Sequence, residues 1–466
     1  MARITRRQFL KAGAVGLGGL TSTRCAHRRT ESKIERPIEL IDHLVVIYQE
    51  NWSFDSLFGR FPGANGIANA GNDIRQVDKD GTPYSVLPPA IDNRGDKSII
   101  DPRIPSNLPV ASFDLGPYVP PDQFCGNPMH RYYQHIAQLN AGKLDKFVAW
   151  STVGALAMSY YDATRLPLGA FAQQFVLCDN FFQATFGGSS LNHIWFVAAA
   201  PAVWPDAPAQ MRAELDGHRL VKDGDVSPDG YVINNAFSVN TPNTPRPPPM
   251  TDPRRLLPNQ TLPTIGDRLS ERGIAWKWYA GGWNDALAGR PHPVFQPHHQ
   301  PFAYFANYAD GTPARQEHLK DEQDFWRDLA NGRLPPVSFI KPIGPLNEHP
   351  GYANLLSGQQ HVERLIRAIM ASSSWPRAAI IVTYDEYGGR WDHVPPPIVD
   401  RWGPGSRVPT VIISPYAKRR FVDHTLYETT SILKFIETRW QLAPLSTRDA
   451  QANDMTAAFD FTQPPV

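Results

Sequence analysis

The sequence has few cysteines, no excess charge of either sign and no long apolar run. Its 466 residues contain only Cys25, Cys125 and Cys178, a number that excludes a disulfide scaffold and a zinc ribbon. Lys and Arg number 46 against 45 Asp and Glu, so no basic excess indicates a nucleic-acid partner. No segment is apolar for long enough to predict a transmembrane helix.

The motifs of several enzyme classes are also missing. The chain has no phosphate-binding P-loop, no His-Glu-x-x-His zinc-protease pattern and no Gly-x-Ser-x-Gly elbow. Proline, in contrast, is abundant at 45 residues, which is typical of a loop-rich enzyme. The length allows one large α/β domain or two modest ones.

The first residues predict an export signal. Residues 4–12 read Ile-Thr-Arg-Arg-Gln-Phe-Leu-Lys-Ala, and a short Gly-rich apolar stretch follows. Arg6-Arg7 with the following Phe-Leu-Lys resembles a twin-arginine signal, which the twin-arginine export machinery reads. A chance basic pair is the alternative. We expect residues 1–36 to be signal peptide and linker, and the protein to be exported, either periplasmic or secreted.

Removal of this segment would take Cys25 and leave two cysteines. An oxidising compartment could pair Cys125 with Cys178. We favour two separate buried thiols, because Cys178 ends the apolar run Phe-Val-Leu-Cys.

Four apolar, β-branched runs predict buried strands, and helical patterns lie between them. The runs are residues 43–48, 175–178, 378–384 and 408–414, and the helical patterns include 359–371 and 430–441. This alternation predicts an α/β fold with a mostly parallel central sheet and helices on both faces. Residues 200–262 are rich in Pro and Asp, and we expect a loop-rich cap inserted into one domain spanning residues 37–466.

Polar and acidic residues follow the predicted strands. In open parallel sheets ligands bind beyond the carboxyl ends of the strands, so Glu50, Asn51, Asp385 and Glu386 should meet at one edge. Adjacent carboxylates such as Asp385 and Glu386 repel each other unless a cation or proton intervenes. Carboxylate and amide oxygens suit a hard cation, and ordinary caps and turns are the alternative.

A glycine-serine loop precedes a further helical pattern. Gly187-Gly188-Ser189-Ser190 leads into residues 194–200, which places a hydroxyl at the positive end of a helix dipole, where phosphate is favoured. The alternative is a serine that only caps the helix, and this local pattern does not separate the two serines. Histidines in Pro/Gly-rich loops could bind phosphate oxygens or protonate a leaving group. They are His130, His298, His299 and His349.

Six ordered blocks resemble the bacterial phosphoesterases that group acid phosphatases with phospholipases C, a branch of the alkaline phosphatase superfamily. They begin at His43, Gly142, Asp179, Ser338, Tyr384 and Ser431, and the resemblance runs from about Ile41 to Phe461. It implies an alkaline-phosphatase-like fold. It also implies that Glu50, Asn51, Asp385 and Glu386 bind one divalent metal ion, that Ser189 is a metal-coordinated nucleophile, and that His130, His298 or His299, and His349 contact phosphate.

The resemblance further implies hydrolysis of phosphate esters through a phosphoserine intermediate. All-oxygen ligands favour Ca²⁺, Mg²⁺ or Mn²⁺, and Ca²⁺ is our first expectation. The Gly-Gly-Ser loop, where phospholipases usually carry Gly-Pro-Thr, and the end of the chain soon after Phe461 favour an acid phosphatase-type phosphomonoesterase. A phospholipase C acting on phospholipids is the alternative. Trp52, Tyr387 and Glu428 depart from the commoner residues of the family without removing this chemistry.

Overall fold

The computed structural model describes residues 36–71, 74–244 and 250–463. By its internal contacts the chain divides into residues 1–36 and a compact unit, Pro37–Val466, which holds the fold. The proposed export signal with Arg6-Arg7, and Cys25, therefore lie outside the described residues. The division expected from the sequence, a domain spanning residues 37–466 with a loop-rich cap at residues 200–262, stays a prediction.

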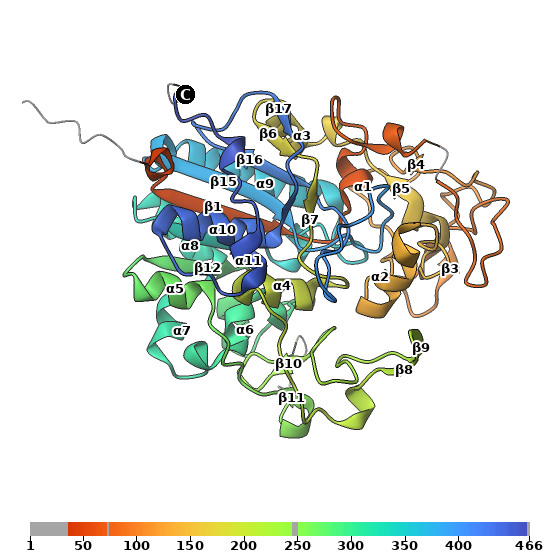
Figure 1. The fold of residues 1–466 in the computed structure, drawn as a ribbon, viewed down its shortest axis with the longest axis horizontal. Coiled ribbons are helices and arrows are strands. Elements are labelled where there is room, and N and C mark those ends of the chain that lie inside the picture. The colour runs from red at the N-terminus through yellow and green to blue at the C-terminus, as the bar shows by residue number, and fades with distance from the viewer. Residues whose placement is uncertain (1–35, 72–73, 245–249, 464–466) are drawn as a thin grey trace, which may run out of the picture. The chain divides into compact units, whose positions relative to one another are not determined.

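An eight-stranded mixed sheet forms the centre of the unit (Figure 1). Its order is β13 (Leu319–Asp321), β12 (Trp276–Ala280), β14 (Val337–Lys341), β1 (His43–Gln49), β15 (Ala378–Tyr384), β16 (Thr410–Ile413), β6 (Val176–Cys178) and β17 (Phe421–Asp423). Neighbouring strands are parallel except at β16, which runs antiparallel to both β15 and β6. The predicted mostly parallel α/β sheet is confirmed.

The direction of one predicted strand was wrong. The run 408–414 was grouped with the parallel strands, but β16, which lies within it, is antiparallel. All four residues of β16 are buried, and burial on both faces gives an apolar run whichever way the strand points. The strands β12, β13, β14 and β17 were not predicted; they are short or carry polar residues such as Lys277 and Lys341.

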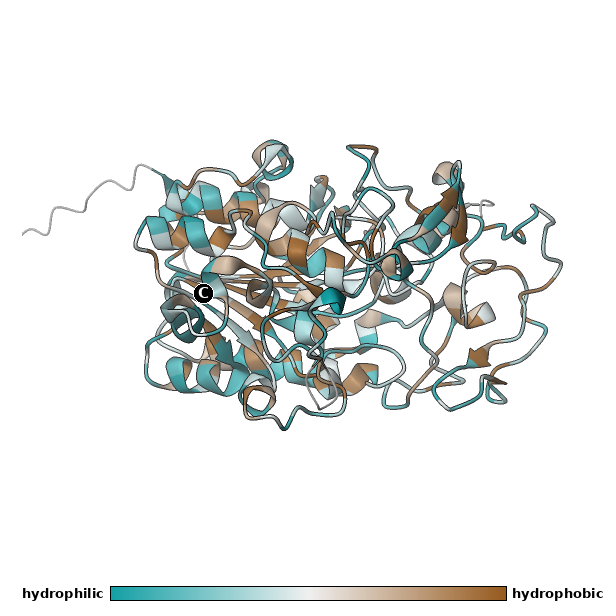
Figure 2. Cartoon of the chain, turned by 90° about the horizontal axis from the view of Figure 1, so that it is seen from below, coloured by the Kyte–Doolittle hydropathy of each residue, from teal (hydrophilic) through white to brown (hydrophobic). Residues whose placement is uncertain are grey.

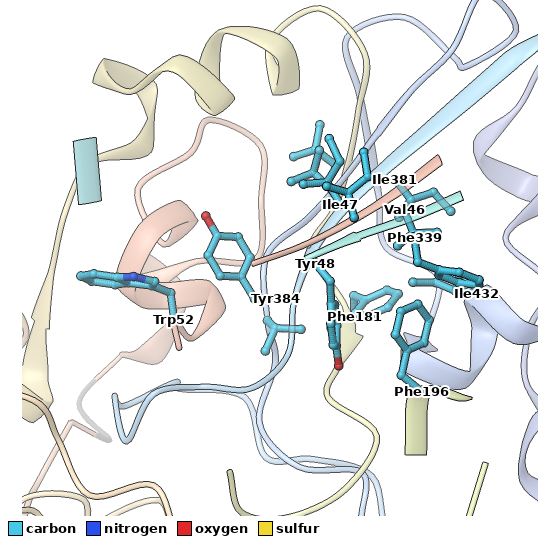
Figure 3. Packing of buried hydrophobic residues seen from close by; sticks show 14 of the residues in the cluster. Val46, Ile47, Tyr48, Trp52, Phe181, Phe196, Phe339, Ile381, Tyr384 and Ile432 are labelled. Carbon is cyan, nitrogen blue, oxygen red and sulfur yellow. The ribbon is translucent and has the colours of Figure 1, made fainter. Parts of the chain in front are cut away.

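Helices cover both faces of the sheet. On one face, Tyr48 packs on Phe196 of α4 (Ser189–Ala198), with ring centroids 4.7 Å apart. On the other, the Tyr384 hydroxyl is 3.1 Å from the Gln359 amide of α9 (Leu355–Met370). Figure 3 shows Tyr48 and Tyr384 pointing in opposite directions from their strands. With α10 (Thr429–Trp440), the observed α9 confirms the two helices predicted around 359–371 and 430–441.

The remaining elements lie at the periphery of the sheet or in loops between its strands. The other helices are α1 (Phe54–Phe58), α2 (Tyr132–Leu139), α3 (Pro167–Ala172), α5 (Ile265–Glu271), α6 (Trp283–Leu287), α7 (Pro313–His318), α8 (Glu322–Ala330) and α11 (Thr447–Gln451). Five two-stranded pairs add β2 (Ile91–Asp92), β3 (Ile99–Ile100), β4 (Phe113–Asp114), β5 (Ser159–Tyr160), β7 (Phe181–Phe182), β8 (Glu214–Asp216), β9 (Arg219–Lys222), β10 (Phe237–Ser238), β11 (Leu256–Leu257) and β18 (Tyr427–Glu428).

The predicted insertion consists mainly of loops around the β8–β9 hairpin and the β10–β11 pair (Figure 1). It is tied to the rest of the unit by Arg131, whose Nε donates to Asp223 at 2.5 Å and whose Nη2 donates to Asp225 at 3.1 Å. Because Arg131 directly precedes α2, these ion pairs hold the insertion beside that helix.

Apolar residues gather in the strands and on the inward faces of the helices, as the hydropathy colouring in Figure 2 shows. Cys125 and Cys178 are both buried and both free, in agreement with two separate thiols. Within the described residues no helix has the length and apolar character needed to cross a bilayer.

Candidate active site

The carboxyl ends of β1 and β15 bring four predicted ligands together. The two strands are parallel, with Gln49 opposite Tyr384, and the Asp385 amide donates to the Gln49 carbonyl at 3.0 Å. The next residues leave the sheet side by side at one edge, as the strand pattern predicted. They are Glu50, Asn51, Asp385 and Glu386, each at most 1% exposed.

Asn51 links the end of β1 to the two carboxylates that follow β15. Its φ is 67°, a left-handed conformation that turns the chain sharply after β1. Its amide N–H donates to Asp385 Oδ1 at 3.1 Å, and its side-chain amide donates to Glu386. Gly388 lies so close that a Cβ there would fall 2.0 Å from the Asn51 carbonyl oxygen, which explains a glycine at this position.

The three carboxylates differ in charge environment. Burial raises the pKa of Asp385 to about 7, although the nearby ammonium of Lys341 opposes this rise. Burial and the neighbouring Asp385 raise the pKa of Glu386 well above its usual value. Burial also acts on Glu50, but the Lys341 ammonium and a hydrogen bond from His299 outweigh it and hold the pKa of Glu50 well below its usual value. The Asp385–Glu386 pair therefore has less positive charge beside it than Glu50 has.

The glycine-serine loop faces the carboxylates. A Cβ on Gly187, whose φ is 90°, would lie 2.8 Å from Tyr132 Cα, and one on Gly188 would lie 2.7 Å from the His130 carbonyl oxygen. Two glycines thus let the loop pack directly against the start of α2. Ser189 is the first residue of α4, and its nearby hydroxyl lowers the pKa of Asp385.

The four predicted histidines meet in the same place. His130 Nδ1 donates to the Pro128 carbonyl at 2.7 Å and His349 Nδ1 to the Pro350 carbonyl at 2.6 Å, because a carbonyl can only accept. In the neutral rings Nε2 is then an acceptor, 3.8 Å from Glu386 in His130 and 3.9 Å from Glu50 in His349. The rings of His298 and His299 are 4.8 Å apart, and His299 Nε2 contacts Glu50.

Burial keeps these histidines neutral. It lowers the pKa of His130 to about 4, with a smaller contribution from His349. Burial likewise lowers the pKa values of His298, His299 and His349. Neutral imidazoles can accept a proton and return it within one reaction cycle.

Three further residues belong to the site and were not predicted. His193 stacks on His299, with Nδ1 3.8 Å from Asp385 Oδ2; its spacing of four residues from Ser189 on a helix was a usable signal. Lys341 Nζ lies 2.9 Å from Glu50 Oε1, and a lysine ending an apolar run, Val-Ser-Phe-Ile-Lys, was the signal there. The Tyr352 hydroxyl donates to Glu50 Oε2 at 3.4 Å, and no sequence pattern singled it out.

A cavity of about 250 Å³ opens over this edge. Both Ser189 and Ser190 line it, so its walls alone do not separate the two serines. The other lining residues are mostly polar: Glu50, Asn127, His130, Arg131, Gly188, Asn234, Asn235, Gln296, His298, His349 and Tyr352. Asn234 and Asn235 come from the insertion. The cavity has room for a phosphate group.

A second group of potential metal ligands lies elsewhere. Asp55, Asp392 and His393 bring ligand atoms within 4.8 Å of one another. Arg407, fully buried, already pairs with both carboxylates, at 3.1 Å from Asp55 and 2.9 Å from Asp392. His393 Nδ1 lies 2.6 Å from Asp55. The geometry allows a metal here, but the guanidinium balances charge that a cation would otherwise balance.

Phospholipases C are among the known proteins similar to this chain. Phospholipase C B of Mycobacterium tuberculosis is 26% identical over 468 residues, which cover 91% of this chain and 78% of the relative. The non-hemolytic phospholipase C of Pseudomonas aeruginosa is 23% identical, and the match covers 99% of this chain and 64% of the relative. Non-specific phospholipase C3 of Arabidopsis thaliana is 23% identical and covers 91% and 74%.

Similarity among solved structures is more distant. An alkaline phosphatase superfamily protein from Vibrio parahaemolyticus is 12% identical with a TM-score of 0.35, covering 74% of this chain and 75% of the other. The phosphonate monoester hydrolase of Agrobacterium radiobacter is 10% identical with a TM-score of 0.34, covering 86% of this chain and 74% of the other. The model of the Phosphoesterase family matches residues 41–443. The chain belongs to the Phosphoesterase family and is a phosphoric ester hydrolase.

Proposed function

We propose that the protein hydrolyses phosphate monoesters of small polar alcohols, with Ser189 as the nucleophile. The observation that carries this proposal is the position of Ser189 at the first residue of α4, beside Asp385 and lining a cavity with His130, His298 and His349. A helix N-terminus attracts phosphate, and a hydroxyl at that point lies close to a bound phosphorus atom.

The residues at the strand edge fit one divalent cation. Asn51 Oδ1 is buried without a hydrogen-bond partner among the described residues, and Lys341 balances the carboxylates of this edge only in part. Glu50, Asn51, Asp385, Glu386 and Ser189 would hold the ion, and their oxygens favour Ca²⁺, with Mg²⁺ or Mn²⁺ as alternatives. When bound, the ion lowers the pKa of a coordinated hydroxyl and neutralises a phosphate oxygen.

The reaction proceeds in two displacements. In the first, Ser189 Oγ bonds to phosphorus as the bond to the alcohol oxygen breaks, and a cavity histidine passes the serine proton to the departing alcohol. In the second, water attacks the phosphoserine from the opposite side, which releases inorganic phosphate and restores the hydroxyl. A neutral histidine whose Nδ1 is tied to a carbonyl, as in His130, has Nε2 free to accept and return that proton.

A phospholipase C activity is the second candidate, and the named relatives favour it. The mostly polar lining of the cavity favours a monoester instead. Paired assays on p-nitrophenyl phosphate and phosphatidylcholine, with metal analysis of the same preparation, distinguish the two. Turnover at least tenfold faster on the monoester is the result we expect; preferential release of phosphocholine would assign the phospholipase activity instead.

We also propose that the protein is exported through the twin-arginine machinery and acts in the periplasm or outside the cell. Arg6-Arg7 and the following Phe-Leu-Lys support this proposal. The twin-arginine pathway carries folded proteins, so the metal site could form before transport.

A further inference from the structure

Lys341 places a completely buried ammonium inside the candidate site. Its Nζ lies 2.9 Å from Glu50 Oε1 and 3.9 Å from Asp385 Oδ2, and its side chain is 0% exposed. The Tyr48 ring lies 5.1 Å from Nζ. Nζ makes no hydrogen bond of good geometry to a described residue, so its interactions are chiefly electrostatic.

The sheet topology determines where the Lys341 side chain lies. β14, β1 and β15 are adjacent and parallel, and Lys341 is the last residue of β14. Its side chain therefore emerges at the edge where Glu50 and Asp385 follow the two neighbouring strands. A lysine at this point serves the site and not the distant core of the sheet.

The charges near this edge do not balance without an ion. Glu50, Asp385 and Glu386 are buried carboxylates, and Lys341 is the one buried ammonium close to them among the described residues. With a bound cation to keep all three carboxylates ionised, they and the ammonium would sum to a charge of −2, which matches one divalent cation.

We propose that Lys341 is a positioning residue that acts as the built-in cation of the metal site. Its ammonium fixes Glu50 and cancels one carboxylate charge, so that the site takes a single divalent ion and disfavours a trivalent one. This inference rests on the proposed function, because it assigns Lys341 a part in that same site.

Glu50 is accordingly fixed on every side. Its Oε1 faces Lys341 and His299, while its Oε2 accepts from Tyr352 at 3.4 Å and lies 3.9 Å from His349. Loss of the ammonium would remove the strongest of these partners and leave one more negative charge at the edge. The affinity of the site for trivalent ions should then rise relative to its affinity for divalent ions.

Metal titration of the folded, metal-stripped protein tests the proposal. Ca²⁺ and Tb³⁺ would be titrated into the wild type, Lys341→Met, Lys341→Arg and the double variant Lys341→Met/Glu50→Gln. Lys277→Met is the matched control, because Lys277 lies on the neighbouring strand β12 and pairs with Asp328 at 2.5 Å outside the site. The wild type should bind one Ca²⁺ per chain. Lys341→Met should raise the Tb³⁺ to Ca²⁺ affinity ratio at least roughly tenfold, while the other variants keep the wild-type ratio.

The possible results separate this inference from the proposed function. A wild type that binds no divalent ion and hydrolyses phosphate esters without metal would remove the metal mechanism itself. Two Ca²⁺ at the site, or a folded Lys341→Met with the wild-type ratio, would overturn the inference alone. Should Lys341→Met fail to fold, recovery of folding in the double variant supports it. If Lys341→Met and the double variant both fail to fold while the single variant Glu50→Gln folds, Lys341 serves the fold and not the metal site.

Discussion

The Nδ1 atom of His193 lies 2.7 Å from the carbonyl oxygen of Ser189, one turn earlier in α4. Because the carbonyl can only accept, His193 donates this hydrogen bond and fixes the first turn of the helix from within the site. The same imidazole stacks on His299, so Ser189, His193 and His299 form one continuous set of contacts beside Asp385.

This arrangement predicts that Ser189 and not Ser190 carries the phosphoryl group. Ser189→Ala should lower kcat by several orders of magnitude while the protein stays folded and binds metal, since the carboxylates remain. Ser190→Ala should change kcat little. Rapid acid quench with a labelled phosphoester, followed by peptide mapping, locates the label. Label on Ser190 or on a histidine would contradict the assignment.

The metal should bind at the strand edge and not at the Asp55–Asp392–His393 group. Asp385→Asn should lose metal and turnover together. Asp392→Asn should retain metal but lower the free energy of unfolding by roughly 3–5 kcal/mol, as breaking a buried ion pair does. Metal content and thermal unfolding of both variants provide the measurement. Metal loss in Asp392→Asn with full content in Asp385→Asn would reverse the two assignments.

Chelation of the wild type should abolish activity and lower its Tm, because an ion bound to the native state stabilises that state. Re-addition of Ca²⁺, Mg²⁺ or Mn²⁺ in turn would show which ion restores both properties. Full activity in a preparation verified as metal-free would rule out the metal mechanism.

The raised pKa of Glu437 should make the stability of the protein depend on pH. Burial, together with Asp449, raises the pKa of this α10 carboxyl to about 9. Between the unfolded value of 4.5 and about 9 the native state holds a proton that the unfolded chain has lost, so this group makes unfolding easier as pH rises. Glu437→Gln should gain stability over the wild type by about 1.4 kcal/mol per pH unit in that range.

Denaturant unfolding of both proteins from pH 5 to pH 9 provides this measurement, and shared titrations elsewhere cancel in the difference. A difference that does not change with pH would show that Glu437 titrates normally.

Export should depend on the arginine pair. Replacing Arg6 and Arg7 with lysine preserves the charge but not the guanidinium groups that the receptor reads. The variant should accumulate in the cytoplasm, as cell fractionation would show. Unchanged export would exclude the twin-arginine route.

The sequence itself determined where the proposed oxygen ligands gather. Apolar runs ending in Glu50-Asn51 and Asp385-Glu386 indicated two buried strands with polar ends, and the convergence of parallel strands followed from that pattern. The two glycines before Ser189 similarly indicated a backbone approach that the packing against His130 and Tyr132 shows. Local composition was enough for these two predictions, because a buried strand and a close backbone approach each require particular residue types within a short segment.

Other features were decided only by the tertiary structure. The direction of β16 was not encoded in its apolar run, since a strand buried on both faces looks the same in either direction. Lys341 stands 291 positions from Glu50 in the sequence, and its ammonium acquires a role only when β14 pairs with β1. The charge balance of the site is a property of that pairing, because electrostatic interactions depend on distance in space, which the order of residues along the chain does not contain.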